Sequence, residues 1–209
     1  VAVFGLGGVG GYTVEALARS GVGSLVLVDH DTISITNINR QLMATTRTVG
    51  RPKVEVLKER LQEINPDAEI NALQDVYNED NSESFNLESY DYVIDAIDSL
   101  KDKAHLILEA TGKGVKLYSS MGAALKLDPM RVKVAEFWEV KGCPLGAALR
   151  RKFKREKLFP KRKFKCVYSD EQPSAFVEGG LGSLHHITAV FGLTMAGLVI
   201  NDVCAKIKA

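Results

Sequence analysis

Two hydrophobic patterns alternate along the first half of the chain. Short continuous apolar runs, such as that in SLVLVDHD, are typical of strands covered on both faces of a parallel sheet. Between these runs, apolar residues recur at the spacing of a helical stripe, as at Val54, Leu57, Leu61 and Ile64. The pattern predicts strands at residues 1–4, 24–31, 68–76 and 90–98, and helices at residues 10–20, 51–65 and 99–114. This alternation indicates an α/β fold with a Rossmann-like, doubly wound, mostly parallel sheet.

The second half of the chain follows a different pattern. Two strand-like segments flank the turn at Asp128 and Pro129, so we expect antiparallel strands to be added to the sheet there. The apolar run over residues 187–200 falls short of the ~20 residues that cross a bilayer, and we expect a buried helix and no membrane contact. The expected strands are residues 116–124, 131–140 and 163–170, and the last helix begins at about residue 184.

Composition is that of one globular domain in a reducing compartment. The chain has 209 residues, 45% of them hydrophobic, which is enough for one substantial core. Its three cysteines are an odd number and lie far apart, which disfavours a disulfide framework and favours a cytoplasmic protein. The chain starts with Val1, already in an expected strand, so we expect further residues upstream.

Positive charge is concentrated in residues 150–165. This basic segment holds ten Lys or Arg and one Glu, which leaves 17 basic and 25 acidic residues elsewhere. Such a run can neutralise the phosphates of an RNA backbone, although a solvated amphipathic helix has the same composition. The interleaved Phe153, Phe159 and Phe164 are interpreted as core residues rather than as base-stacking residues. The RNA-binding candidates are Arg150, Arg151, Lys154 and Arg155.

A glycine-rich turn follows the first strand. Gly5, Gly7 and Gly10 have the spacing of a dinucleotide-binding turn, and Asp29 follows Gly10 by nineteen residues, where an acid binds ribose. The turn offers backbone N–H groups and a helix N-terminus to phosphate, so it suits a redox dinucleotide or a nucleoside triphosphate equally. A tight strand-to-helix turn without any ligand is the structural alternative.

The residues beyond Asp29 favour the triphosphate. Arg40 and, thirteen residues later, Lys53 offer a planar fork and a point charge that suit a triphosphate, whereas hydride transfer needs no such cations. Asp95 and Asp98 close a strand at the edge where α/β proteins bind ligands. Asp98 is the Mg²⁺ candidate, and Asp95 is expected to cap the next helix or to bind the loop.

Several motifs in residues 1–125 resemble one enzyme family. GLGGVG, LVDHDTISITNINRQ, Lys53 and DAIDS are similar in order and spacing to the adenylate-forming enzymes that include ubiquitin-activating enzymes and the ThiF, MoeB and HesA proteins. The resemblance implies attack of a carboxylate on the α-phosphate of ATP, with Mg²⁺ bound at Asp98. It implies that Asp29 binds ribose and that Arg40 and Lys53 are catalytic cations. The implied ATP-binding set is Gly5, Gly7, Gly8, Gly10, Asp29, Asp31, Asn37, Asn39, Arg40, Gln41, Lys53, Asp98 and Ser99.

The second half is similar to one branch of that family. DAIDSLKDKAHLI, CPLGAALRRKFKREK and CVYSDEQP resemble the tRNA threonylcarbamoyladenosine dehydratases, whereas SAFVEGGLGSL does not align. That branch adenylates the threonyl carboxylate of a modified adenosine in tRNA, and an internal nitrogen then closes a ring with loss of AMP. The resemblance to the family also implies a homodimer, often with an arginine from the partner's N-terminal segment near the phosphates. The implied organisation is one ATP-binding adenylation domain over residues 1–209, with a nucleotide-binding half (1–125) and a substrate and dimer half (126–209).

Three other functions stay open. A sulfur-carrier or ubiquitin-like protein adenylyltransferase has the same fold, but the paired Cys-x-x-Cys motifs of the sulfur-carrier enzymes are missing here. An NAD-binding redox protein and a non-catalytic nucleotide-binding scaffold are the remaining classes. The sequence also leaves open which tRNAs would be used, whether a monovalent ion binds, whether a cysteine desulfurase is a partner and whether Cys166 is more than a buried thiol.

Overall fold

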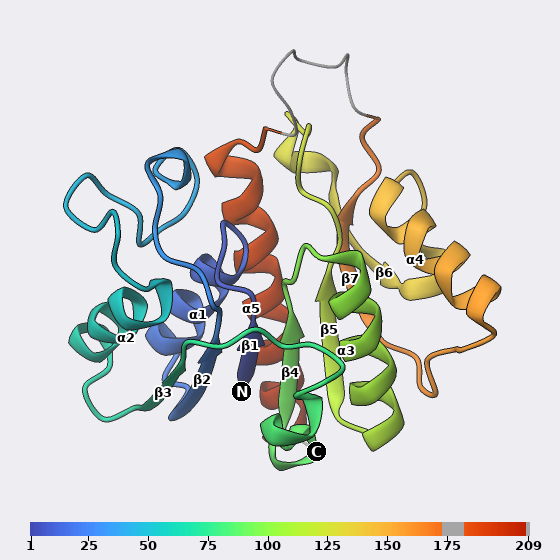
Figure 1. The fold of residues 1–209 in the computed structure, drawn as a ribbon, viewed down its shortest axis with the longest axis horizontal. Helices are drawn as coiled ribbons and strands as arrows, with labels where there is room; N and C mark the ends of the chain where they lie inside the picture. Colours follow the sequence, from blue (N-terminus) through green and yellow to red (C-terminus); the bar gives the residue numbers. More distant parts are fainter. Residues whose placement is uncertain (173–181, 208–209) are drawn as a thin grey trace.

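A seven-stranded sheet forms the centre of the molecule. The computed structural model describes residues 1–172 and 182–207. The strands lie in the order β3-β2-β1-β4-β5-β7-β6 (Figure 1). Their bounds are β1 Ala2–Phe4, β2 Ser24–Val28, β3 Glu69–Leu73, β4 Tyr92–Asp95, β5 Lys116–Ser120, β6 Val132–Glu136 and β7 Lys165–Ser169.

Six of these strands are parallel, and β6 pairs antiparallel with β7 at one edge. The predicted α/β class with an antiparallel addition is confirmed. The addition is smaller than the sequence suggested, because β7 joins β5 in parallel and only β6 runs the other way. The chain leaves β1 toward β2 on one side and later returns to β4 on the other. The strand order therefore reverses between β1 and β4, which is where open α/β sheets bind ligands.

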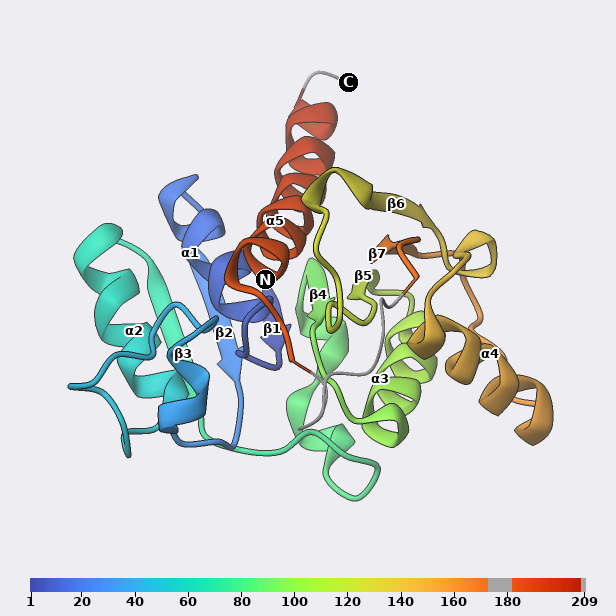
Figure 2. The ribbon, with the colours of Figure 1, turned by 90° about the horizontal axis from the view of Figure 1, so that it is seen from above.

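Helices cover both faces of the sheet (Figure 2). Alternate strand residues point to opposite faces, so Val3 belongs to one core cluster whereas Ala2 and Phe4 belong to the other. The first cluster includes residues of α1, α2 and α5, and the second includes residues of α3 and α4. The helices are α1 Gly10–Arg19, α2 Lys53–Ile64, α3 Leu100–Lys113, α4 Pro144–Glu156 and α5 His185–Ile207.

The C-terminal helix α5 is longer than its apolar run suggested. It has 23 residues, so by length and composition alone it could cross a membrane, and the length argument from the sequence was wrong. One face of it nevertheless packs into this chain's own core through Ile187, Phe191 and Met195. A Cβ on Gly192 would lie 2.5 Å from the carbonyl oxygen of Val9, so the glycine permits close contact between α5 and α1. The predicted buried helix is confirmed on this face.

Candidate nucleotide-binding site

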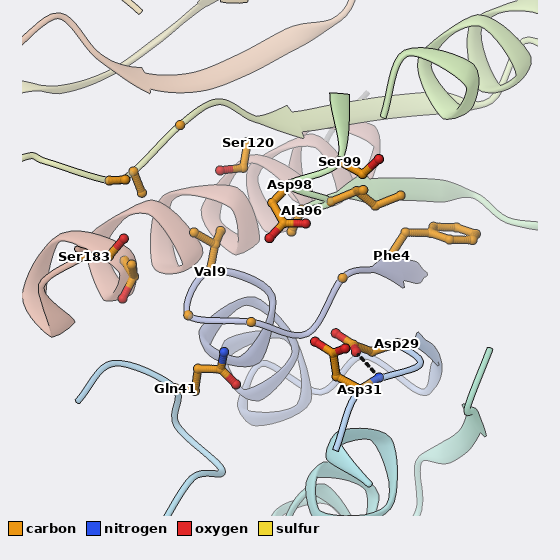
Figure 3. Close-up of a pocket in the computed structure, with 18 of the residues that line it drawn as sticks. Phe4, Val9, Asp29, Asp31, Gln41, Ala96, Asp98, Ser99, Ser120 and Ser183 are labelled. Carbon is orange, nitrogen blue, oxygen red and sulfur yellow. Dashed lines mark hydrogen bonds between the residues drawn. The ribbon is translucent and has the colours of Figure 1, made fainter. Parts of the chain in front are cut away.

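A pocket of about 620 Å³ opens at the carboxyl ends of the central strands. It lies at the reversal of strand order between β1 and β4, and residues from β1, β2, β4 and β5 or their following loops line it (Figure 3). All members of the predicted ATP-binding set line this pocket except Gly10 and Asn39. The structure thus brings together residues spread over nearly a hundred positions of sequence.

Glycine shapes the turn between β1 and α1. Gly5 has a φ of 87°, a left-handed conformation that side chains rarely adopt. A Cβ on Gly10 would lie 1.9 Å from the carbonyl oxygen of Gly5, so no side chain fits there. Gly10 therefore shapes the turn without lining the pocket. Gly7 and Gly8 border the pocket beside the N-terminus of α1, which favours an anionic group.

Asp29 is held by backbone donors. The N–H of Leu6 donates to Asp29 Oδ2 at 2.7 Å, and the N–H of Asp31 donates to Asp29 Oδ1 at 2.8 Å. These bonds fix the carboxylate at the end of β2, against the glycine turn. This is the position that the sequence predicted for a ribose-binding acid.

Lys53 is buried at the start of α2, with 4% of its surface exposed. Its Nζ donates to Asp31 Oδ2 at 2.6 Å and lies 3.9 Å from Asp29 Oδ1. Partial burial is the largest single influence and favours the neutral acid at Asp31. The hydrogen bond and the charge of Lys53, with a smaller contribution from His30, together outweigh it and hold the pKa of Asp31 below its ordinary value. Lys53 is therefore a fixed cation at the pocket wall and not a solvated surface lysine.

The loop after β2 supplies Asn37, Arg40 and Gln41 to the pocket. Arg40 donates to the carbonyl of Thr36 and to Asn39 Oδ1, both at 2.9 Å. Asn39 donates its amide to the carbonyl of Ser183 at 3.1 Å, so it ties this loop to the segment before α5. Gln41 is buried, and its Oε1 finds no hydrogen-bond partner among the described residues. A buried acceptor of this kind, in a pocket wall, fits a bound polar ligand.

The two aspartates after β4 have different environments. Asp95 is fully buried and accepts hydrogen bonds from Lys103 Nζ at 2.8 Å and Ser119 Oγ at 2.6 Å. Lys103 also donates to the carbonyl of Ile97 at 2.9 Å, so the pair fixes the loop that carries Asp98. Asp98 is exposed, points into the pocket and makes no hydrogen bond to any described residue (Figure 3). Ser99 caps α3, its hydroxyl accepting from the N–H of Asp102 at 3.4 Å.

The pocket has two candidate positions for a metal ion, a cluster of three residues and the single carboxylate of Asp98. Ligand atoms of Asp29, His30 and Asp31 all lie within 4.8 Å of one another. The carboxylates of that cluster are already engaged, Asp29 by two backbone N–H groups and Asp31 by Lys53. Asp98 presents its carboxylate to the pocket without such partners among the described residues. It fits Mg²⁺ better, since Mg²⁺ keeps several waters and binds one or two carboxylates together with substrate phosphates.

Sequence reasoning missed the far wall of the pocket. The loop after β5 contributes residues 120–126, and the start of α4 contributes Pro144 and Leu145. Leu125 has a φ of 57°, an uncommon conformation for a residue other than glycine, and Lys126 beside it is buried. Lys126 donates to the carbonyl of Glu171, whose carboxylate accepts from the N–H groups of Leu127 and Asp128. No sequence motif predicts this wall, because its geometry depends on a contact between residues 45 positions apart in the chain.

The predicted RNA-binding residues do not share one environment. Arg151, Lys154 and Arg155 on α4 are exposed. Arg150 is half-buried, donates to the carbonyl of Phe137 at 3.2 Å and lies over the Phe137 ring. Its guanidinium is thus engaged in packing.

Burial also tests the interpretations of the three phenylalanines and of Cys166. Phe153 and Phe164 are core residues as expected, but Phe159 is 47% exposed, so the core interpretation was wrong for that residue. The strand β7 buries Cys166 completely, and this burial raises the pKa of its thiol, which disfavours a reactive thiolate. Most of the unaligned stretch SAFVEGGLGSL, residues 174–181 of its span 174–184, lies outside the described residues.

Residues 1–207 match the ThiF family. The chain belongs to the ThiF family. It is 46% identical over 225 aligned residues to a tRNA threonylcarbamoyladenosine dehydratase of Bacillus subtilis, covering 100% of this chain and 88% of that protein. A molybdopterin-synthase adenylyltransferase of Escherichia coli is 33% identical, over 91% of this chain and 71% of that protein.

Solved structures give the same family. The E. coli tRNA N6-threonylcarbamoyladenosine dehydratase in complex with ATP superposes with a TM-score of 0.91 at 34% identity, over 99% of this chain and 86% of that one. Its complex with AMP gives a TM-score of 0.92. The resemblance inferred from the motifs is therefore confirmed at the level of family and fold.

Proposed function

We propose that this chain is an ATP-dependent tRNA-modifying enzyme that adenylates and cyclises N6-threonylcarbamoyladenosine. The observation that carries the proposal is the pocket itself, where the carboxylate of Asp29, the buried cation of Lys53 and the exposed carboxylate of Asp98 meet beside the glycine turn. The similarity to dehydratases along the whole chain supports the same activity.

In the proposed reaction the threonyl carboxylate attacks the α-phosphate of ATP and pyrophosphate leaves. An internal nitrogen then attacks the acyl-adenylate, closes the ring and releases AMP. Asp29 binds the ribose, and the cations of Arg40 and Lys53 stabilise the charge that develops on the phosphates. Such preorganised charges act without reorganisation at the moment of reaction, so they lower the barrier. Lys53 is well suited because Asp31 and α2 already hold it in place.

Asp98 would hold Mg²⁺, together with phosphate oxygens and water. The ion would supply charge neutralisation to the departing pyrophosphate. Asn37, Gln41 and Ser99 complete the nucleotide contacts in this proposal, whereas Asn39 and Gly10 position the loops that carry them.

We also propose a cytoplasmic homodimer. Apolar side chains on α5 and the edge strand β6, including Leu193, Val203 and Val134, are exposed in the single chain and offer a surface for a second copy. A sulfur-transfer partner has less support, because no cysteine lines the described pocket and Cys166 is buried.

A pyrophosphate-release assay tests the function. The enzyme is mixed with ATP and Mg²⁺, and then with tRNA carrying threonylcarbamoyladenosine, with tRNA lacking it, or with a sulfur-carrier protein. We expect release only with the modified tRNA, together with formation of the cyclic nucleoside. Release that depends on the carrier protein would instead support the alternative function, a carrier-protein adenylyltransferase. The 33% identity to a molybdopterin-synthase adenylyltransferase is the reason to test it. Tight binding of NAD in place of ATP, measured by calorimetry, would contradict both.

A further inference from the structure

Two aromatic side chains lie side by side on the surface near α4. Trp138 and Phe159 are 41% and 47% exposed, and their ring centroids are 6.2 Å apart. Phe159 belongs to the loop between α4 and β7, and Trp138 belongs to a short 3₁₀ turn after β6. Two neighbouring exposed rings form a surface on which a planar group such as a nucleic-acid base can stack.

The pair is anchored to the core. Phe137, which is fully buried, packs edge-on to Trp138 at 5.1 Å and to Phe153 at 5.7 Å, and stacks on Phe164 at 5.0 Å. The N–H of Trp138 donates to Glu136 Oε2 at 2.9 Å, which fixes the turn. The Trp138 ring is thus held against the core before any ligand arrives, and ordering it on binding would cost little conformational entropy.

Exposed cations flank Phe159 in the sequence. Those of the last turns of α4 and the following loop are Arg151, Lys154, Arg155, Lys157, Lys161, Arg162 and Lys163. Cations that track a phosphate backbone, combined with aromatic rings on which bases stack, are the means by which proteins bind single-stranded nucleic acid. An anionic lipid surface would also accept charges and aromatic rings, but it offers no bases, so the test below includes lipid vesicles.

The helix α4 links this surface to the pocket. Its first residues, Pro144 and Leu145, line the pocket, and its 13 residues span about 20 Å. Phe137 contacts Arg150 and Phe153 in the later turns, so the Trp138–Phe159 pair lies toward the far end of α4. α4 lies at the outer edge of the molecule, on the side away from α1 and α2 (Figure 2).

We propose that the Trp138–Phe159 pair stacks an unpaired base of the RNA substrate at a site distinct from the modified nucleotide. This inference rests on the proposed function, because it takes the modified nucleotide to occupy the pocket. The pair would hold a neighbouring part of the same loop while the basic residues of α4 follow the backbone between the two sites.

Trp138 is the single tryptophan of the chain, so its fluorescence reports on this site directly. The chain is titrated with tRNA, with inorganic polyphosphate and with anionic phospholipid vesicles, and absorption by RNA is corrected with N-acetyltryptophanamide. We expect saturable quenching by tRNA and little by polyphosphate, which carries the charge without bases. Equal quenching by polyphosphate, or a response to vesicles alone, would overturn the proposal.

Variants separate stacking from charge. Trp138→Ala and Phe159→Ala should each weaken tRNA binding roughly tenfold without changing its salt dependence, because a stacked base is lost and no cation is. Trp138→Phe, and Leu158→Ala as an exposed apolar control beside Phe159, should bind like the parent. Parent-like affinity of Trp138→Ala would reject the stacking site even if pyrophosphate release with tRNA is normal. Quenching with tRNA but no tRNA-dependent pyrophosphate release would keep the site and reject the proposed reaction.

Discussion

Asp95 and Asp98 are separated by two residues and differ in burial and in hydrogen bonding. Asp95 is buried and satisfied by Lys103 and Ser119, whereas Asp98 faces the pocket. Since Asp98 is exposed, Asp98→Asn should leave the melting temperature unchanged. It should lower Mg²⁺-dependent AMP formation by a factor on the order of 100, because a neutral amide is a poor ligand for a hard cation. Turnover at the parent rate over a Mg²⁺ titration would remove Asp98 from the metal site.

The buried Asp95–Lys103 pair predicts a stability effect. Both side chains are fully buried, so Lys103→Met leaves a carboxylate without its cation. We expect the free energy of unfolding to fall by roughly 3–5 kcal/mol in urea denaturation. The double variant Asp95→Asn/Lys103→Met should recover a large part of that loss. If the single variant costs less than ~1 kcal/mol, water must reach the site and the pair is not isolated.

The role of a site residue could be predicted from the sequence where its position in a motif has a steric or electrostatic reason. Gly5 and Gly10 follow from the turn that they must make, and Asp29 follows from its place at the end of β2. Lys53 by itself could not be told from a surface lysine, because its burial results from Asp31 and from the packing of α2. The unpartnered Gln41 and the left-handed Leu125 depend on tertiary contacts and carry no sequence signature.

At the scale of elements, α5 is tied to the sheet by polar contacts near its C-terminus. Asp202 accepts from Lys116 of β5 at 2.9 Å and from the hydroxyl of Tyr92 of β4 at 2.8 Å. Chiefly through the bond from Lys116, these partners lower the pKa of Asp202 to about 2. The contribution to stability is therefore present above the ordinary pKa of 3.8 and is lost as the pH falls through the folded pKa of about 2.

Asp202→Asn should lower the free energy of unfolding by about 1 kcal/mol at pH 7, an amount reduced for solvent screening. The difference from the parent should shrink below pH 4 and be mostly lost by pH 2, where the Asp202 carboxyl of the folded protein is half protonated. Denaturation at a series of pH values measures this. A constant difference between pH 7 and pH 2 would mean that packing, and not charge, links α5 to the sheet.

The hydrophobic pattern predicted the strands of the sheet but not their order. In the first half, short apolar runs and helical stripes predicted β1 to β4 and α1 to α3, because β1, β2 and β4 are largely buried on both faces and only the edge strand β3 is partly exposed. In the second half the same patterns gave β5, β6 and β7 as strands. They did not give their order, since β7 inserts between β5 and β6 in the sheet. The period of the hydrophobic pattern predicts whether a segment is a helix or a strand. The pairing of strands depends instead on contacts between segments far apart in the chain.

At the scale of the whole molecule, charge is distributed unevenly. The basic segment 150–165 contrasts with an acidic balance elsewhere, 25 acidic against 17 basic residues. The structure places its first part on α4 at one edge of the sheet, with α2 and β3 at the opposite edge (Figure 1). RNA would therefore approach one edge, and the rest of the surface would repel it.

Replacement of Arg151, Lys154 and Arg155 by Gln tests this polarity. Arg150 is kept, because it is engaged with Phe137. Each lost phosphate contact removes about 0.7–0.9 from the slope of log affinity against log salt, so the slope for tRNA should fall by about 2. The control replaces Arg47, Arg51 and Lys58, which lie in α2 or in the loop before it, by Gln and should keep the parent slope. ATP affinity should survive in both variants, since neither set lines the pocket. Equal slopes for the two variants would show that the basic segment is a solvated surface, and a protein carboxylate would then become the better candidate for the substrate.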